Sequence, residues 1–528
     1  MTDGIIVNLP FIVSIRFFWL LSIGLQIAIP ALAQQGGNRL LPTNDSAYEY
    51  ILRLQRRGHL LDLNPTALPY QWGEITNAIH QVDTTRLSSS ERHWMDLLQS
   101  RFQSQESTDE DIHVGYSMMG AVDLLNSERM DMVRPIGNDL NVYWHASLAS
   151  AYLEAGPAVA ELSVTHSNFY DQDPDGIDSA LRLLARSEHS YVGFNQKWIS
   201  AYIGRWNLHW GSSGQGSTIL SDNARSRDQI FLRLGGRRAS VTAILSELDS
   251  ATDGRYYTGR AADDSVKFES TRRFHAAHRW DFRPSRKFMI SFMESAIYSG
   301  PSSSISLRYL NPVNPFLFVV DNVPKNDDNN GFLAGLLWTQ LNRWTIQGQL
   351  MVDDLRIQSN TGPETITFAL TGSAVYALPS TDIKFTFETV SSRAYNAPQT
   401  EGQYIFLNRG IATQFSDYVH SSLSAEFYLD HRVPGLRMLP KIDLLYQGER
   451  DMRQPFPESS EVIENLLDGE ANRTMRTSMS MMYQPVHWWW IGVDAGYNIN
   501  RGESNQFIGL VSAGIKVNFD TSINLWDW

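Results

Sequence analysis

The chain has 528 residues, no cysteine and a formal net charge of −13. The acidic balance argues against a general nucleic-acid binder, because such proteins need a basic surface. The lack of cysteine excludes disulfides, Cys-zinc sites and thiol catalysis. The mean hydropathy of −0.28 looks soluble, yet 11% of the residues are aromatic. A membrane barrel gives the same average, because its strands alternate apolar and polar residues.

The N-terminus has the pattern of a secretory signal peptide. Residues 17–29 form a short apolar run after Arg16, and Ala31-Leu32-Ala33 provides a small-residue cleavage site. A membrane anchor is the alternative reading, but Asn8 and Arg16 interrupt the longer run that it would need. No later stretch approaches the roughly 18 apolar residues of a spanning helix. We therefore predict cleavage after residue 33 and export of a chain that can cross a membrane only with strands.

Residues 44–102 are predicted to contain three short amphipathic helices. Tyr48, Ile51 and Leu54 share one stripe of the first helix, and a second pattern covers residues 71–82. Ser88 followed by Glu91 is a capping signal for the third. We predict a small periplasmic helical bundle and linker over residues 34–111.

From residue 112 onward, runs of alternating residues recur with turn clusters between them. In one run Ile383, Phe385 and Phe387 alternate with Asp382, Lys384, Thr386 and Glu388. Similar runs cover residues 344–353, 366–373, 419–430, 474–483 and 489–500. One nearly uncharged face and one polar face are typical of a lipid-facing wall around a wet lumen, and closure removes the sheet edges. The fold class is therefore mainly β: a large antiparallel transmembrane β-barrel of about 16 to 18 strands. A propeller or a large sandwich is the alternative, but no blade-length repeat is present.

The C-terminal region has the pattern of a closing barrel strand. Residues 511–519 carry apolar side chains at every second position and end in Phe519, which resembles the signal by which bacterial barrels are recognised for assembly. We assign residues 112–519 to the barrel and 520–528 to a tail, leaving open whether Phe519 or Trp528 ends the last strand. The long polar loops expected on the outer side cover residues 171–178, 250–270, 311–331, 391–402 and 448–472.

The most distinctive stretch covers residues 192–238. Its even positions carry Phe194, Trp198, Tyr202 and Trp206, which we predict to face lipid. The odd positions Arg205, Asn207 and His209 would then face the lumen. A Gly/Ser segment follows, and we predict a structural turn there. The segment has P-loop spacing, but Ser217 occupies the lysine position.

Arginines gather in the same stretch, and two interpretations stay open. They could bind the carboxylates or phosphates of acidic sugars or lipopolysaccharide, or they could pair with acidic lumen residues and brace the barrel. The six are Arg205, Arg225, Arg227, Arg233, Arg237 and Arg238. Elsewhere, Asp171, Asp173, Asp175 and Gly176 imitate the start of a calcium loop, but a solvated acidic loop is the preferred reading. No cofactor, metal site or catalytic residue is predicted.

Part of the stretch resembles the signature of the capsule-assembly Wzi family, which has a Trp-Gly-Pro-Gly turn and a Leu-Ser-x-Asn-Ala-Arg-Pro block. Here Ser212-Ser213 replaces the Pro-Gly, and Ser226 replaces the final Pro. The candidate site residues in and around this motif are Gly204, Arg205, Asn207, His209, Trp210, Gly211, Gly216, Ser217, Ser221, Asn223, Ala224 and Arg225.

The resemblance implies a bacterial outer-membrane barrel that binds capsular or extracellular polysaccharide and organises it at the cell surface without catalysis. The expected partners are this polysaccharide, outer-membrane lipid and the barrel-assembly machinery, with the protein as a monomer and no nucleic acid. The alternatives are a porin or transporter with an open aqueous lumen, and an enzyme acting on lipid or polysaccharide. Substitution of Arg205 and Arg225 is expected to impair folding or retention of surface glycan.

Overall fold

The computed structural model describes residues 37–102, 111–126, 142–171, 185–250, 272–300, 303–316, 328–353, 367–397, 400–407, 409–453, 466–501 and 505–524. The predicted signal peptide and residues 172–184 of the acidic loop lie outside this part of the chain. Everything below concerns the described residues.

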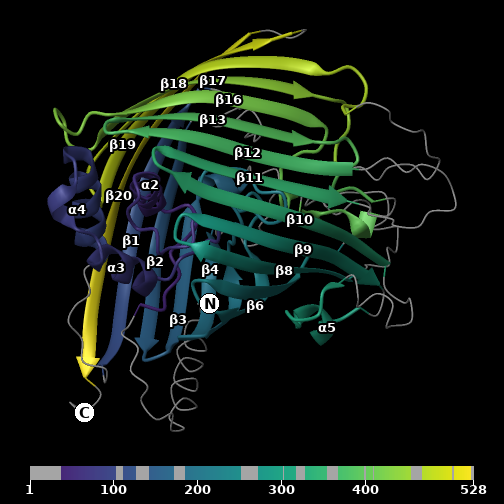
Figure 1. Cartoon of the computed structure of the whole chain (residues 1–528), viewed down its shortest axis with the longest axis horizontal. Coiled ribbons are helices and arrows are strands. Elements are labelled where there is room, and N and C mark those ends of the chain that lie inside the picture. Colours follow the sequence, from purple (N-terminus) through teal and green to yellow (C-terminus); the bar gives the residue numbers. More distant parts are fainter. Residues whose placement is uncertain are drawn as a thin grey trace, which may run out of the picture.

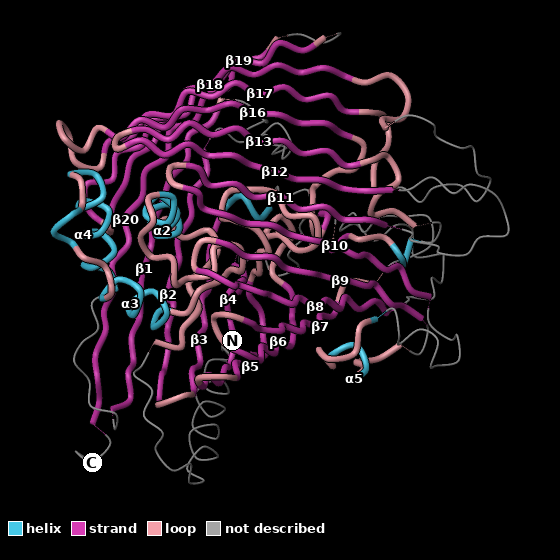
Figure 2. The backbone as a smooth tube through the Cα atoms, in the orientation of Figure 1, coloured by secondary structure: helices cyan, strands magenta, loops and turns pink. Residues whose placement is uncertain are grey.

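Eighteen strands form one closed antiparallel barrel (Figures 1 and 2). Each strand pairs with the next, and β1 pairs with both β2 and β20, which closes the ring. This confirms the predicted fold class, and the strand number lies within the expected range. The strands of the barrel are β1 (Asp111–Leu125), β2 (Val142–Ala155), β3 (Ala158–Ser167), β4 (Ala185–Gln196), β5 (Ile199–Trp206), β6 (Arg227–Gly235), β7 (Ala239–Glu247), β8 (Arg272–Ser285), β9 (Phe288–Gly300), β10 (Asp328–Leu341), β11 (Trp344–Asp353), β12 (Thr367–Leu378), β13 (Thr381–Val390), β16 (Tyr418–Tyr428), β17 (Leu436–Gln447), β18 (Asn472–Val486), β19 (Trp489–Asn500) and β20 (Gln506–Asn524).

The outer surface of the barrel is apolar. Ile383 and Phe385 of β13 are exposed while the alternate residues face inward, and Ile491 and Val493 repeat the pattern on β19. The apolar positions of the alternating runs thus lie side by side on neighbouring strands and form one continuous outer surface.

The two ends of the barrel differ in the length of their connections. At one end most turns are short: only residues 156–157 separate β2 from β3, and 342–343 separate β10 from β11. At the other end the connections are long, as between β5 and β6 or β13 and β16. We call these the short-turn end and the long-loop end. The last strand continues five residues beyond Phe519, to Asn524, so most of the predicted tail is strand.

The predicted helices are confirmed as α2 (Ala47–Arg56), α3 (Trp72–His80) and α4 (Ser89–Phe102), with a 3-10 turn at Thr84–Arg86. The Ser88 N–H donates to Glu91 at 2.7 Å, and the Glu91 N–H donates to Ser88 Oγ at 3.4 Å, which is the predicted cap of α4. The helices share a compact core of their own, around Ile51, Ile75 and Trp94. In the described chain, none of the helices has the length and apolarity needed to cross a membrane.

One loop segment lies against the outer wall near the long-loop end. Residues 303–316, which include the short helix α5 (Leu307–Leu310), pack Tyr309 and Phe316 onto strands β7, β8 and β9. Beneath them lies a buried pair in which His278 Nδ1 is 2.8 Å from Glu294 Oε1. The backbone N–H of Phe316 donates to Glu294 at 2.9 Å, so the segment covers this outward-facing pair. We call residues 303–316 the strap.

Candidate functional site in the barrel interior

The Wzi-like motif lies in the loop between β5 and β6, and this loop enters the barrel. We call residues 207–226 the inserted loop. The carbonyl of Trp210 accepts from Gln349 Nε2 on β11 at 2.9 Å, and the Gly216 N–H donates to Glu388 on β13 at 3.2 Å. Backbone bonds between His209 and Leu68, of 2.9 and 3.1 Å, connect the loop to the N-terminal region. The loop therefore spans the lumen and contacts its far side.

A second segment fills the interior beside the inserted loop. Residues 391–417 connect β13 to β16 and carry the small hairpin β14 (Ile405–Phe406) and β15 (Arg409–Gly410), with a 3-10 turn at Thr400–Gly402. Ser221 N–H donates to the Ile411 carbonyl at 3.0 Å, and Asn223 Nδ2 donates to the Gly410 carbonyl at 2.8 Å. These bonds join the two segments into one insert.

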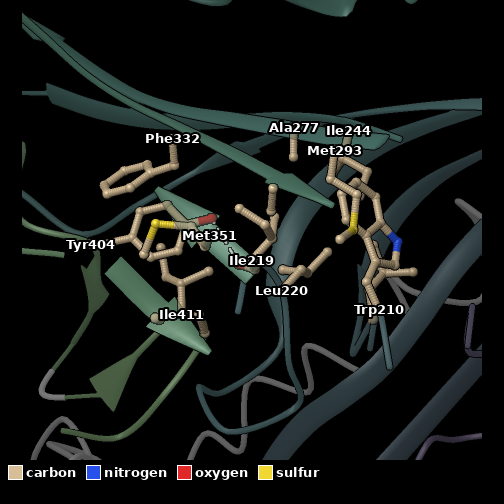
Figure 3. Packing of buried hydrophobic residues seen from close by; sticks show 14 of the residues in the cluster. Trp210, Ile219, Leu220, Ile244, Ala277, Met293, Phe332, Met351, Tyr404 and Ile411 are labelled. Atoms are coloured by element: carbon tan, nitrogen blue, oxygen red, sulfur yellow. Dashed lines mark hydrogen bonds between the residues drawn. The ribbon is translucent and has the colours of Figure 1, made fainter. Parts of the chain in front are cut away.

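The insert and the wall of β5 to β11 form a dry core (Figure 3). Ile219 and Leu220 from the inserted loop are fully buried, and Ile411 comes from the hairpin region. On β10 the inward positions Phe332, Ala334, Leu336 and Trp338 are all apolar and buried. The alternation predicted a lumen lined only by polar residues. This prediction is wrong for the half of the lumen next to β5 to β11.

The predicted facing of the opening stretch is correct for Trp198, which is exposed, but wrong for Tyr202 and Trp206 of β5. Tyr202 and Trp206 are buried inside the barrel, and Tyr202 Oη donates to the Asn38 carbonyl at 2.9 Å. Ile203 is 59% exposed on the outer surface. Arg205 does not point to the lumen but pairs with exposed Asp228 across the strands, with Nε to Oδ1 at 3.2 Å. The reason is that the N-terminal region and the insert supply an apolar interior, which takes up the large aromatic rings.

Most of the candidate residues hold the inserted loop in shape. Ser217 Oγ donates to the Trp210 carbonyl at 2.9 Å, and His209 Nδ1 lies 3.2 Å from Asp222. Trp210, Gly211, Ser221, Asn223 and Ala224 are buried in the same loop, whereas Asn207 is half-buried and lines the open part of the lumen.

At two glycines among the candidate residues, an added Cβ would lie very close to other atoms. Gly204 has a φ of +136°, and a Cβ there would lie 2.3 Å from the Ser190 carbonyl oxygen. A Cβ on Gly216 would lie 2.4 Å from Glu388 Oε1. The backbone at Gly204 therefore requires glycine, whereas a side chain at position 216 would only displace the Glu388 carboxylate.

The arginines of the stretch are mostly engaged with acids. Arg225 pairs with Glu188 at 2.8 Å, Arg237 with Asp62 at 3.0 Å, and Arg233 lies 3.7 Å from Glu74. With Arg205, four of the six have a carboxylate partner, and among these partners Glu188 lines the lumen.

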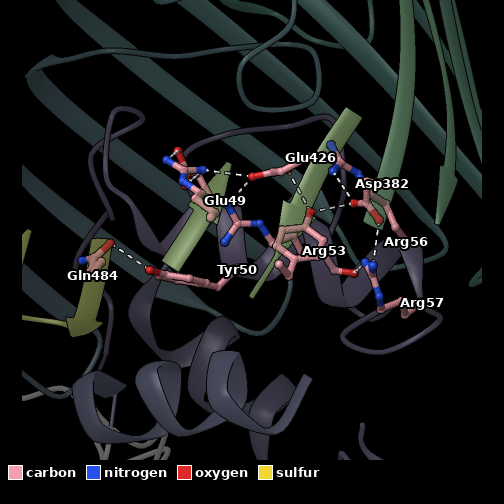
Figure 4. Close-up of polar contacts among 10 residues, drawn as sticks. Glu49, Tyr50, Arg53, Arg56, Arg57, Asp382, Glu426 and Gln484 are labelled. Carbon is pink, nitrogen blue, oxygen red and sulfur yellow. Dashed lines mark hydrogen bonds and ion pairs between the residues drawn. The ribbon is translucent and has the colours of Figure 1, made fainter. Parts of the chain in front are cut away.

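Ion pairs attach the helical region to the barrel wall near the short-turn end (Figure 4). Arg53 of α2 pairs with Glu426 on β16 at 2.7 Å. Arg56 and Arg57 both bind Asp382 on β13, at 2.9 and 2.7 Å. Figure 4 also shows Tyr50, whose hydroxyl donates to Gln484 on β18 at 2.8 Å.

A further ion pair holds the segment before α2. Asp45 binds Arg101 of α4 and lies 3.6 Å from Lys516 on β20. Burial opposes ionisation of this carboxyl, but the two cations hold its pKa well below the usual range.

Opposite the dry core, the lumen is hollow and is lined by polar and apolar residues together. Two adjoining cavities of about 670 and 660 Å³ share the lining residues Asp45, Glu49, Asp222 and Arg437. We call them together the chamber. The walls come from the N-terminal region, the tip of the inserted loop, and strands β1 to β4, β13 and β16 to β20. Volumes of this size are typical of ligand-binding pockets.

Of the candidate residues selected from the sequence, Asn207, Gly216 and Ser221 line the chamber, whereas the residues of the surrounding wall were not selected. Asp382, Lys384 and Glu388 were recognised only as the polar face of one strand. That face, together with His420, Ser422, Ser424 and Glu426 on the neighbouring strand, was the available signal. In the described residues no group of three or more His, Asp or Glu side chains is placed to hold a metal ion.

Comparison with solved structures shows a Wzi-like fold. The chain is similar to Wzi of Escherichia coli, described as an outer-membrane protein involved in group 1 capsule assembly and a carbohydrate-binding β-barrel, with a TM-score of 0.59 and 12% identity over 91% of this chain and 99% of that one. Weaker similarity, at a TM-score of 0.44 and 10% identity over 78% of this chain and 99% of that one, connects it to OccK5 (OpdH) of Pseudomonas aeruginosa. No protein-family model matches the sequence, and no curated protein matches it.

Proposed function

We propose that the protein is an outer-membrane barrel that binds capsular or extracellular polysaccharide and organises it at the cell surface, without covalent catalysis. The observation that carries this proposal is the obstructed interior. The helical region covers the short-turn end, and the inserted loop crosses the lumen to reach β11 and β13. A barrel built in this way is better suited to holding a ligand than to passing solutes. The Wzi-like fold supports the same reading.

The outer surface supports placement in a membrane. Its apolar residues would face lipid, as in other membrane barrels. Periplasmic turns of such barrels are short, so the helical region at the short-turn end would be periplasmic and the long loops extracellular. The signal peptide over residues 1–33, insertion by the barrel-assembly machinery and a monomeric state remain parts of this proposal.

The proposal is tested by removing the protein from capsulated cells. We expect the mutant to make the same total amount of polysaccharide but to release more of it into the medium. Expression of the full chain from a plasmid should restore attachment. Normal retention of polysaccharide in the mutant would contradict the proposal.

The porin alternative has one specific observation in its favour, the hollow chamber with its charged lining residues. If the chamber joined both ends of the barrel, the purified protein would give steady single-channel conductance in planar bilayers. We expect a closed barrel with only rare or brief openings. Stable open channels would favour the porin, whereas release of shortened glycan from cell surfaces by the pure protein would favour an enzyme.

A further inference from the structure

On the side of the chamber lined by β13 and β16, one lysine has no carboxylate partner among the described residues. Lys384 lies on β13 with its side chain toward the lumen, since its neighbours Ile383 and Phe385 are exposed on the outer surface. It makes no hydrogen bond or ion pair with any residue that the structure describes. The other cations around this part of the chamber, which are Arg53, Arg56, Arg437 and Lys441, all pair with carboxylates.

The carboxylates nearby are already engaged. Asp382 holds Arg56 and Arg57, and Glu426 holds Arg53 and Arg437. Glu388 accepts from the Gly216 N–H and from the Tyr418 hydroxyl, both at 3.2 Å. None of these three acids forms an ion pair with Lys384 among the described residues.

The wall around Lys384 carries hydroxyl groups. In the strand register Lys384 is opposite Ser424, and Ser424 is opposite Lys441, so a serine lies between the two lysines. Next to this row, Thr386 Oγ1 and Ser422 Oγ form a hydrogen bond of 2.8 Å. Hydroxyl and ammonium groups around a cavity of about 660 Å³ offer donors for a ring that carries both hydroxyls and an acid.

We propose that this part of the chamber, on β13 and β16, binds an anionic sugar residue, with Lys384 as the counter-ion of its carboxylate. The inference rests on the proposed function and narrows it, since the polysaccharide would then be acidic. Binding adds the missing partner to Lys384 and forms a charge-assisted hydrogen bond, which is stronger than a neutral one.

The test uses the full-length protein in detergent and trigalacturonate as the probe, with its methyl ester as the uncharged match. We expect calorimetry to give at least tenfold weaker binding for the ester. Lys384→Met should weaken binding of the acid at least tenfold and leave the ester unchanged, whereas Lys384→Arg should keep most of the affinity. Lys287→Met, in the exposed turn between β8 and β9, is the matched control and should bind as the parent does.

The natural absence of cysteine allows a second measurement. Lys384→Cys provides a unique thiol, and we expect a charged maleimide to label it in the folded protein. Because this variant lacks the lysine, protection by ligand is measured instead on Ser424→Cys, which keeps Lys384. Trigalacturonate should slow that labelling, and its methyl ester should not.

Equal binding of acid and ester, or full affinity in Lys384→Met, would overturn the inference. Displacement of trigalacturonate by an equal concentration of inorganic phosphate would also overturn it, because the site would then recognise a simple anion. These binding results are separate from the cell experiment. Loss of surface polysaccharide in the null mutant with no preference for the acid would leave the proposed function standing without the acidic specificity.

Discussion

The two halves of the barrel interior differ in their filling: one is packed with side chains and the other is hollow. Beneath β5 to β11 the wall presents Trp206, Phe332 and Trp338 to the insert, and the space is filled. Beneath β13 and β16 to β20 the wall presents Lys384, Glu426 and Lys516, and the space is hollow. The strands are otherwise alike, and the same apolar outer surface covers both halves. The type of residue that faces the lumen is therefore set by what lies inside the barrel at that point.

The residues that hold the insert in shape and the residues that line the chamber therefore lie mostly in different halves of the barrel. The Wzi-like motif belongs almost entirely to the filled half, where it holds the insert. The chamber, where a ligand could fit, borrows from the motif region only Asn207, the tip of the inserted loop and neighbouring residues such as Asp222. Substitutions in the two halves should therefore affect different measurements.

The largest effect on stability is expected for Trp210→Ala. The side chain is buried in the dry core, and its loss leaves a cavity that costs about 3–5 kcal/mol of the free energy of unfolding. Denaturant unfolding in detergent measures it. Trp490→Ala is the control in the hollow half, where the ring is only half-buried, and should cost less than about 2 kcal/mol. Equal losses would contradict the division into two halves.

Asp382→Asn should come next, at about 3 kcal/mol, because Arg56 and Arg57 would lose the charge that they share. The helical region should become easier to digest while the barrel stays intact, as limited proteolysis followed by electrophoresis would show. Asp228→Asn removes the exposed partner of Arg205 and serves as the matched control. Digestion at the parent rate in Asp382→Asn would show that these pairs do not hold the helices in place.

Asn223→Ala should cost about 1–2 kcal/mol, since it removes the bond to the Gly410 carbonyl and leaves that oxygen buried. Thermal unfolding measures the loss. Ligand binding in the chamber should not change, because Asn223 lies on the side of the insert that faces the hairpin. A change in affinity without a change in stability would place Asn223 in the binding site instead.

Arg205→Gln should have the smallest effect, below about 1 kcal/mol, because its pair with Asp228 is open to solvent. Arg225→Gln should cost somewhat more, as its pair with Glu188 is less exposed. The sequence alone led us to expect serious impairment from both arginines. Severe misfolding of Arg205→Gln would restore that expectation.

The barrel could be predicted from the sequence because one face of most strands is apolar throughout. The inner face is mostly apolar in one half of the barrel and mostly polar in the other, but on the outer face apolar residues recur at every second position of the strand in both halves. The three helices were equally visible in their stripes and caps. The loop motif predicted a shaped turn, and the structure places that turn inside the lumen.

The facing of β5 could not be predicted in the same way. Both of its faces are apolar, with Ile199 and Ile203 on one and Tyr202 and Trp206 on the other. Alternation separates two such faces but does not say which is inside; only the N-terminal region, which accepts the hydrogen bond from Tyr202, decides this. The special position of Lys384 was hidden for a related reason, because it depends on which distant acids are already paired.

The strap gives the wall an uneven stiffness around its circumference. Between β7 and β9 the strap covers the outside and the insert fills the inside, so that residues 274–278 of β8 are all buried, whichever way they point. Backbone amides in such a sector exchange with solvent only through rare, large openings. Strands β18 to β20 have an uncovered apolar outer surface on one side and the hollow chamber on the other, and they should open more readily. Slow deuterium uptake near Ala276 beside faster uptake near Gly496 would show a barrel that flexes on the side that lines the chamber.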